Sequence, residues 1–166
     1  MIRSIDDFVT VWNQEVGNTL SLFAALSDAA MPQAVTTEHR DLGRLAWHIT
    51  GTIREMMEKT GLHVDGPEEH APVPATTAEI VAQYKQSSES FVKALDGWTD
   101  ADLDVEDAMY GESWKRALTL QILLLHQTHH RGQMTVLMRQ AGLPVPGMYG
   151  PAKEDWAKFG MPTPTI

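Results

Sequence analysis

Residues 114–141 read WKRALTLQILLLHQTHHRGQMTVLMRQA, a stretch without proline that Gly142 and Pro144 follow closely. A glycine just past the last turn and a proline soon after it are typical of a helix end. We therefore predict one helix from about Trp114 to Ala141. At about 1.5 Å per residue this helix is about 40 Å long, and it carries three of the seven histidines of the chain.

Three further segments carry apolar residues at steps of three or four, which is typical of amphipathic helices. Capping residues indicate where each helix begins, and glycine or proline indicates where it ends. The expected helices run from a Ser4 cap to about Ala30, before Pro32; from a Thr36 or Thr37 cap to Gly61; and from a Thr76–Glu79 capping box to Leu95.

The segments between these helices show no strand alternation. Residues 62–75 hold several prolines and acids and are expected to form a loop. Residues 97–113 are expected to form a connection with a short helical turn near 99–103. Four amphipathic segments without a convincing strand predict an all-α four-helix bundle. Because two connections are long, a crossover topology fits the sequence as well as a simple up-and-down one.

The length of 166 residues suits one domain with a sizeable core. We assign residues 1–142 to the bundle. Residues 143–166 form a proline-rich tail, expected to pack on the same domain, with one short helical turn begun by Pro151.

Composition narrows the expected partners. The chain has 13 Lys plus Arg against 22 Asp plus Glu, a formal net charge of −9. Nucleic acids and anionic membranes bind clusters of Lys and Arg, so we expect neither as a partner. There is no cysteine, which excludes a disulfide, a protein thiolate nucleophile and every Cys-ligated metal site. The N-terminus lacks the apolar core of a signal peptide, and no 18-residue apolar run is present, so we expect a cytoplasmic protein.

The histidines of the long helix have the spacing of metal ligands. His126 and His130 are four positions apart, which places their Cβ atoms about 6 Å apart on one helix face. Two imidazole nitrogens can then reach one ion about 2.1 Å from each. His129 could compete for this role, but it points roughly 100° away from His130. The spacing therefore predicts that one divalent ion is held by a pair of histidines.

A third ligand has to come from a neighbouring helix, and His48 is the candidate. It lies beside the apolar stripe of its own helix, where a buried imidazole without a partner costs a few kcal/mol. A shared metal ion would satisfy it, and so would a hydrogen bond within the core. Three histidines with a coordination position left for water are typical of a catalytic site rather than a structural one. The alternative is a structural bundle in which these histidines bond to one another and to the backbone.

One competing site can be excluded. The pair His126 and His130 has the spacing of the H-E-x-x-H metalloprotease helix, but position 127 is Gln. The general base that activates the zinc-bound water is therefore missing, and we do not expect proteolysis.

The run His126-x-x-x-His130-Arg131-Gly132-Gln133 resembles the H-x-x-x-H-R-G-Q signature of the DinB/YfiT-like family of metal-dependent enzymes. His48 falls where that family has its first histidine, and residues 145–151 resemble the tail of one DinB subgroup. The resemblance extends over essentially the whole chain, although only the H-R-G-Q block is specific.

The resemblance implies a four-helix bundle with a three-histidine site for one divalent metal ion, often in a homodimer. Carried over by position, the metal ligands are His48, His126 and His130, and His129 stays outside the site. Similar proteins include mycothiol-dependent maleylpyruvate isomerases and bacillithiol S-transferases, which implies a low-molecular-weight thiol as a second cofactor. The family supports the site more strongly than the substrate.

Four other residues near the predicted site have open roles. Gln133 could orient a ligand or a water, or be a surface amide. Glu55, two turns after His48, could reach the metal or act as a base, or be solvated. Arg131 is expected to form a structural ion pair, with an anionic substrate as the other possibility. Gly132 costs about 1 kcal/mol relative to Ala within a helix, which the close approach of a neighbouring helix would explain.

The leading hypothesis is therefore a metal-dependent enzyme that acts on a small molecule, such as a thiol-dependent S-transferase or a related hydrolase or isomerase. The alternative is a non-catalytic metal-dependent ligand-binding or stress-response protein. Zinc is the first choice of ion, with nickel or iron next, because three imidazoles accept all three.

Overall fold

The computed structural model describes residues 2–165, so Met1 and Ile166, the outer ends of the two predicted ranges, lie outside the described residues. The bundle consists of four long helices, which confirms the predicted mainly α-helical fold. They are α1 (Ile5–Ala24), α2 (Leu42–Glu58), α3 (Thr77–Leu95) and α4 (Arg116–Gln140).

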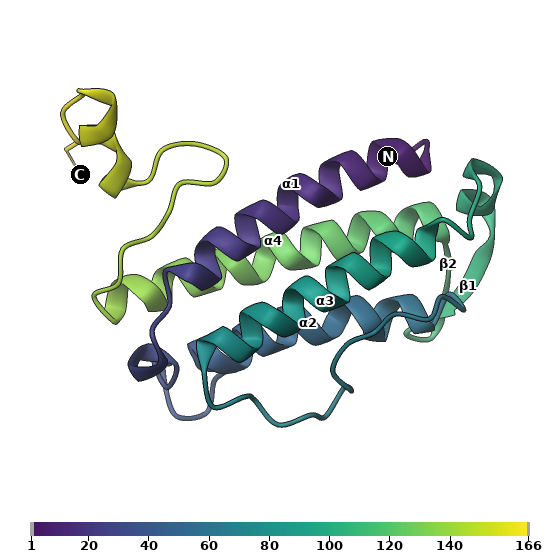
Figure 1. The fold of residues 1–166 in the computed structure, drawn as a ribbon, viewed down its shortest axis with the longest axis horizontal. Coiled ribbons are helices and arrows are strands. Elements are labelled where there is room, and N and C mark those ends of the chain that lie inside the picture. The colour runs from purple at the N-terminus through teal and green to yellow at the C-terminus, as the bar shows by residue number, and fades with distance from the viewer. Residues whose placement is uncertain (1, 166) are drawn as a thin grey trace.

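The helices form a square in which α2 packs against α3 and α4, and α1 packs against the same two helices. Figure 1 shows that α1 and α4 run in one direction along the bundle while α2 and α3 run in the other. The parallel pair α2 and α3 requires a return, and residues 59–76 supply it by running back along the length of the bundle. The fold therefore uses the crossover alternative.

Two of the predicted helix starts are confirmed. The Ser4 hydroxyl accepts a hydrogen bond from the backbone N–H of Asp7. Thr76 and Glu79 form the reciprocal capping box at the start of α3. Both caps satisfy backbone donors that have no partner within the first turn.

Two other predicted boundaries are wrong. Helix α1 ends at Ala24 rather than near Ala30, and a separate 3₁₀ turn, η1 (Asp28–Ala30), follows it. The cap of α2 is Asp41, whose carboxylate accepts from the N–H of Arg44, rather than Thr36 or Thr37. Thr36 instead bonds to the ring of His39 within the connection.

The segment before α4 contains an unpredicted β-hairpin. After the expected short turn, η2 (Asp100–Asp104), strands β1 (Glu106–Met109) and β2 (Glu112–Lys115) pair antiparallel, with Met109 opposite Glu112. The two turn residues Tyr110 and Gly111 have φ of 52° and 89°. Positive φ at both positions is the type I′ geometry that suits the twist of a hairpin. The hairpin displaces the start of α4 from the predicted Trp114 to Arg116.

Gly142, whose φ is 73°, ends the helix as predicted, and the tail follows it. Its helical segment, η3 (Lys153–Phe159), is a 3₁₀ helix that begins two residues after Pro151. Figure 1 shows this end of the chain projecting from the bundle.

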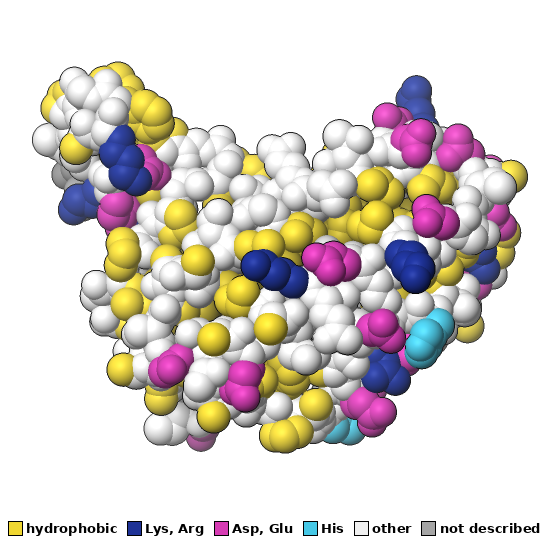
Figure 2. Space-filling view, in the orientation of Figure 1, with side chains coloured by type: hydrophobic (Ala, Val, Ile, Leu, Met, Phe, Trp, Pro, Cys, Tyr) yellow, Lys and Arg dark blue, Asp and Glu magenta, His cyan; other side chains and the backbone are white. Residues whose placement is uncertain are grey.

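On the face of the molecule drawn in Figure 2, Lys and Arg side chains lie apart from one another or beside acidic ones. Within residues 2–165, none of the helices has the length and apolar character needed to cross a membrane.

Candidate metal centre

Three imidazoles from two helices converge at one point of the bundle. His48 comes from the middle of α2, and His126 and His130 come from successive turns of α4. The Nε2 atom of His126 lies 3.2 Å from Nε2 of His48 and 3.1 Å from Nε2 of His130. One nitrogen of each ring lies within 4.8 Å of the others, so the three side chains could hold a metal ion. The structure thus brings together the three histidines selected from the sequence.

The distances from Nε2 of His126 to the other two Nε2 atoms suit ligands of one ion. Nitrogen ligands about 2.1 Å from an ion at tetrahedral or right angles lie about 3.0–3.4 Å apart. Hydrogen bonding alone accounts for them poorly, because a neutral imidazole nitrogen has either one N–H or one lone pair. Nε2 of His126 faces two other Nε2 atoms and can make a good hydrogen bond to only one of them. A shared cation satisfies all three lone pairs.

The protonation state of the rings also suits a metal. Burial, reinforced by the positive charge of Arg40, lowers the pKa of His48 to about 3. Burial, together with the neighbouring His130, lowers the pKa of His126 to about 4. The pKa of His130 is also lowered, again mainly by burial. The rings are therefore neutral near pH 7, which is the form that binds metals.

Gln133 contacts the three converging histidines, which we call the triad, through His130. Its Oε1 atom lies 2.7 Å from Nδ1 of His130, and its Nε2 atom lies 3.1 Å from the exposed ring of His129. An acceptor at Nδ1 fixes the tautomer with the lone pair on Nε2, an arrangement common around metal-binding histidines. Nδ1 of His126 has no partner among the described residues. His129 lies outside the converging group.

Two cavities adjoin the triad. A polar cavity of about 420 Å³ is lined by His48 and His126. A second cavity of about 370 Å³ is lined by His130 together with Gln133 and mainly aliphatic side chains. Arg40 lines both cavities. The triad is therefore accessible to a small molecule from more than one direction.

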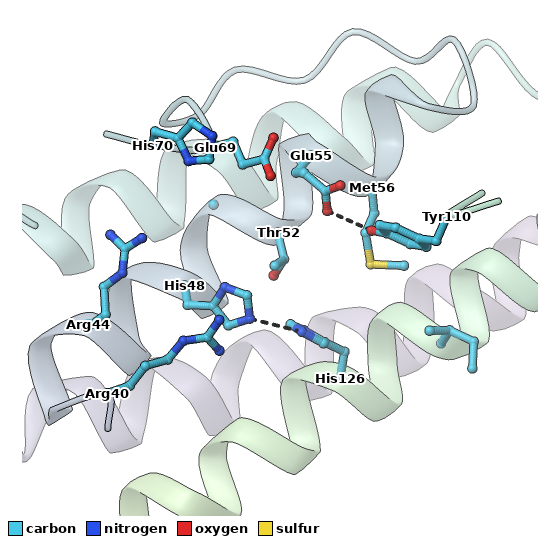
Figure 3. A pocket seen from close by; sticks show the side chains of 12 residues that line it. Arg40, Arg44, His48, Thr52, Glu55, Met56, Glu69, His70, Tyr110 and His126 are labelled. Carbon is cyan, nitrogen blue, oxygen red and sulfur yellow. Dashed lines mark hydrogen bonds between the residues drawn. The ribbon is translucent and has the colours of Figure 1, made fainter. Parts of the chain in front are cut away.

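Glu55 lines the polar cavity, at the end away from Arg40 and Arg44 (Figure 3). Its carboxylate accepts a 2.7 Å hydrogen bond from the Tyr110 hydroxyl and pairs with Lys59 at 3.2 Å. The unpredicted hairpin thus contributes Tyr110 to the cavity wall. Glu55 is not one of the side chains that converge with the histidines.

Comparison with known proteins fits this arrangement. The sequence profile of the DinB family matches residues 1–165. The chain belongs to the DinB family. Uncharacterized protein YrdA of Bacillus subtilis (strain 168) is a DinB relative that is 44% identical over 167 positions, covering all of both chains.

Two solved structures have the same fold. A DinB-like protein from Bacillus cereus ATCC 10987 is 40% identical, with a TM-score of 0.86 over 90% of this chain and 100% of that one. The DinB-like protein YjoA of Bacillus subtilis matches with a TM-score of 0.65 over 83% of this chain and 96% of that one. At 20% identity, YjoA supports the fold alone.

Gln127 links the two helices that carry the three converging histidines. It is fully buried, and its side-chain N–H donates to the backbone carbonyl of Ile49, the residue after His48, at 2.9 Å. Its oxygen accepts from the hydroxyl of Tyr84 on α3 at 3.2 Å. The sequence identified Gln127 only as the absence of a general base. Because Gln127 is next to His126 in the interior of a predicted helix, the sequence could have indicated a buried amide at this position.

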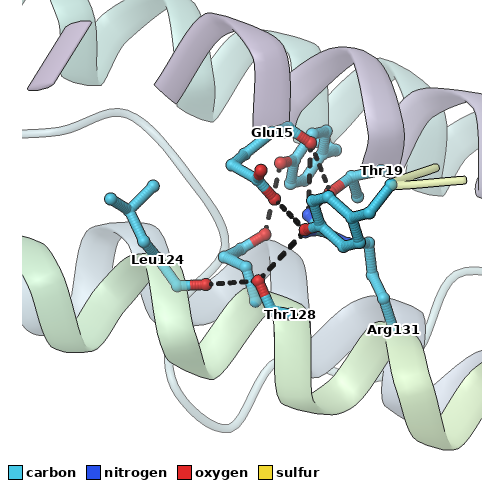
Figure 4. A network of polar contacts seen from close by, with 8 residues as sticks. Glu15, Thr19, Leu124, Thr128 and Arg131 are labelled. Atoms are coloured by element: carbon cyan, nitrogen blue, oxygen red, sulfur yellow. Dashed lines mark hydrogen bonds and ion pairs between the residues drawn. The ribbon is translucent and has the colours of Figure 1, made fainter. Parts of the chain in front are cut away.

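Arg131, directly after His130, links α4 to α1. It is fully buried, and its guanidinium pairs with Glu15 and donates to the hydroxyl of Thr19 at 2.7 Å (Figure 4). The expected structural ion pair is confirmed. The hydroxyl of Tyr149 in the tail contacts both Arg131 and Glu15.

We expected a neighbouring helix to lie close to Gly132, and within a single chain this prediction is wrong. Gly132 is exposed, and a Cβ built on it would meet nothing within 4 Å. The other histidines, His39, His63 and His70, are exposed, and His39 and His70 each line a cavity.

Proposed function

We propose that the protein binds one divalent metal ion through His48, His126 and His130. We further propose that it is an enzyme whose reaction depends on this ion. The observation that supports this most directly is that Nε2 of His126 faces the Nε2 atoms of both other rings. Zinc is our first choice, and nickel and iron are the next, since imidazole binds all three. Three ligands leave a coordination position for a further molecule.

We further propose a thiol-dependent transferase or a related isomerase or hydrolase. A bound divalent ion supplies Lewis acidity, which lowers the pKa of a coordinated thiol or water. The chain has no cysteine, so the sulfur has to come from a small molecule. Two cavities beside the triad suit a reaction with two substrates, because one can hold the thiol and the other its acceptor.

The chain itself contributes positioning and burial. Gln133 orients His130 through Nδ1, and Gln127 fixes the spacing of α2 and α4 at the triad. His130 is only 7% exposed, so the site is partly shielded from water. A shielded site strengthens electrostatic interactions with a reacting group.

The first test is the metal content of untagged protein, measured by elemental analysis. We expect one equivalent of a divalent metal in the wild type and loss of most of it in His126→Ala. His129→Ala is the matched control, since it removes an exposed histidine of the same helix and should leave the metal content unchanged. Equal metal content in wild type and His126→Ala would show that the site assignment is wrong.

The second test asks whether a thiol reaches the metal ion, which the thiol-dependent proposal requires. In cobalt-loaded protein, adding 2-mercaptoethanol should change the visible absorption spectrum, because a sulfur ligand enters the open position. If cobalt binds to the triad but neither this thiol nor others change the spectrum, the non-catalytic metal-dependent alternative is favoured.

We also propose that two copies associate through the outer face of α4. Leu118, Leu125 and Val136 are 42%, 55% and 54% exposed. At 100° per residue they lie within about 20° of one another around the helix. Gly132 lies on nearly the same line, where it has no neighbour within its own chain. A second helix packed on this face would explain both the apolar stripe and the glycine.

A further inference from the structure

Two arginines at the start of α2 stand beside the triad without an acidic partner. Arg40 and Arg44 both line the polar cavity that contains His48 and His126. Neither makes an ion pair with any described residue. Among the described residues, the Arg44 side chain makes one hydrogen bond, a 3.5 Å approach to the carbonyl of Ala71, and the Arg40 side chain makes none. In a chain of net charge −9, two unpaired arginines in one cavity are notable.

The positive charge of this pair lies beside the triad. Arg40 lines both cavities that adjoin the triad, and Arg44 lines the one that contains His48 and His126. Figure 3 shows both arginines on the His48 side of the cavity. The end of the cavity near the metal position is therefore positive even before an ion binds.

Glu55, one of the two acidic side chains of the same cavity, lies at the end away from the arginines (Figure 3). The charges of Glu55 and Glu69 act on Tyr110, whose pKa they raise in addition to the effect of burial. Glu55 is already compensated by Lys59 and by the Tyr110 hydroxyl, and Glu69 forms no ion pair with Arg40 or Arg44.

We propose that Arg40 and Arg44 form an anion subsite, so that the small molecule that reaches the metal carries a carboxylate or phosphate group close to its metal-binding atom. This proposal rests on the proposed function, because it places the anionic group beside the metal position. Guanidinium groups bind such anions with paired, charge-assisted hydrogen bonds. A cationic ligand would be repelled by both arginines and by the ion.

The shape of the site gives Arg40 a second role. Arg40 lines the aliphatic cavity as well as the polar one. In the aliphatic cavity its neighbours include Val35, Leu45 and Leu137. A ligand anchored by its anionic group at Arg40 can therefore place an apolar part among these side chains. The favoured class is an anionic small molecule rather than a neutral or cationic one.

The test compares two thiols that differ in charge, mercaptoacetate and 2-mercaptoethanol, titrated into cobalt-loaded protein and followed by absorption. The measured quantity is the ratio of their dissociation constants in each protein, so the intrinsic acidity of each thiol cancels between proteins. We expect the preference for mercaptoacetate to fall by about tenfold or more in the double variant Arg40→Gln, Arg44→Gln, as for loss of a charge-assisted contact. Arg40→Gln alone should show part of this fall.

The matched control is the double variant Lys85→Gln, Lys93→Gln, which makes the same change of net charge on exposed positions of α3. It should keep the wild-type ratio. The source of the anion is distinguished by competition: displacement of mercaptoacetate by inorganic phosphate at lower concentration than by acetate indicates a phosphate group, and the reverse indicates a carboxylate.

Each failure has its own signature. If the Arg40→Gln, Arg44→Gln protein binds cobalt and keeps the wild-type ratio, the anion subsite is wrong while the metal site stands. If the wild type does not bind cobalt at all, the proposed function is wrong, and the subsite falls with it. Cobalt binding by the double variant also shows that its triad is intact, so a folding defect is not mistaken for a lost subsite.

Discussion

At the scale of single residues, the candidate site depends on three imidazoles that the fold keeps neutral. Burial lowers the pKa values of His48 and His126 to about 3 and about 4 from 6.5. A metal ion therefore competes with few protons for these rings near neutral pH. Without an ion, the protein holds three polar rings in close contact with a single good hydrogen bond available at Nε2 of His126.

These shifts predict how the stability of the metal-free protein depends on pH. Above pH 6.5 the two rings are neutral in both folded and unfolded states, and they add no pH dependence. As the pH falls from 6.5 towards 4, the unfolded state takes up protons that the folded state does not, so the free energy of unfolding decreases. Urea denaturation in the presence of a chelator measures this slope. The slope should be smaller in His48→Gln, His126→Gln; an equal slope would contradict the assigned shifts.

The three histidines could be predicted from the sequence, but on different grounds. His126 and His130 follow from helical spacing, and His48 needed the family resemblance, because a histidine beside an apolar stripe is equally suited to a hydrogen bond. Arg40 was not found. Arg40 is of interest because no described acidic side chain pairs with it, and this can be recognised only once its neighbours in space are known.

At the scale of helices, the geometry of the triad depends on how α2 is held against α4. Gln127 makes this contact directly, between its amide N–H and the carbonyl of Ile49. Because Ile49 follows His48 and Gln127 follows His126, the bond joins the two helices within one residue of the ligands. Arg131 makes the corresponding contact from α4 to α1, next to His130.

We expect Gln127→Leu to lower both stability and metal affinity. The change leaves the buried hydroxyl of Tyr84 without its acceptor and removes the bond to Ile49, which should cost about 1–3 kcal/mol. Because the helices are then less well fixed, the metal affinity should fall by about tenfold, or about 1.4 kcal/mol. Thermal unfolding and cobalt titration measure the two effects.

Tyr84→Phe is the control for this variant. It removes one hydroxyl and leaves the bond between Gln127 and Ile49 in place. It should reduce stability while leaving the metal affinity close to that of the wild type. If both variants weaken metal binding equally, Gln127 acts through general stability and does not position the triad.

The helices were predicted more reliably than their boundaries. A capping box such as Thr76–Glu79 is local, so sequence alone identifies it. The end of α1 depends instead on a distant contact, since Asp28 in η1 accepts hydrogen bonds from the backbone and hydroxyl of Thr77. The β-hairpin was missed because its turn is Tyr110-Gly111, and only the second of these residues commonly adopts positive φ.

At the scale of the whole molecule, the apolar face of α4 predicts the state of assembly. We expect light scattering to give the wild type the mass of two 18.4 kDa chains and Leu125→Glu the mass of one, because a carboxylate in the centre of the face has to be desolvated. Val105→Glu, at another exposed apolar residue outside this face, is the matched control. A monomeric wild type, or dissociation caused equally by Val105→Glu, would contradict the proposed interface.

The return connection, residues 59–76, has a consequence for how such a protein can diversify. It contributes Glu69 and His70 to the wall of the polar cavity, yet it carries none of the three converging histidines. Replacing the exposed part of this segment around Glu69 and His70 would therefore change which molecules the cavity accepts while the bundle keeps the histidines in place. Loop grafting between homologues, with the helices left untouched, offers a direct route to altered selectivity.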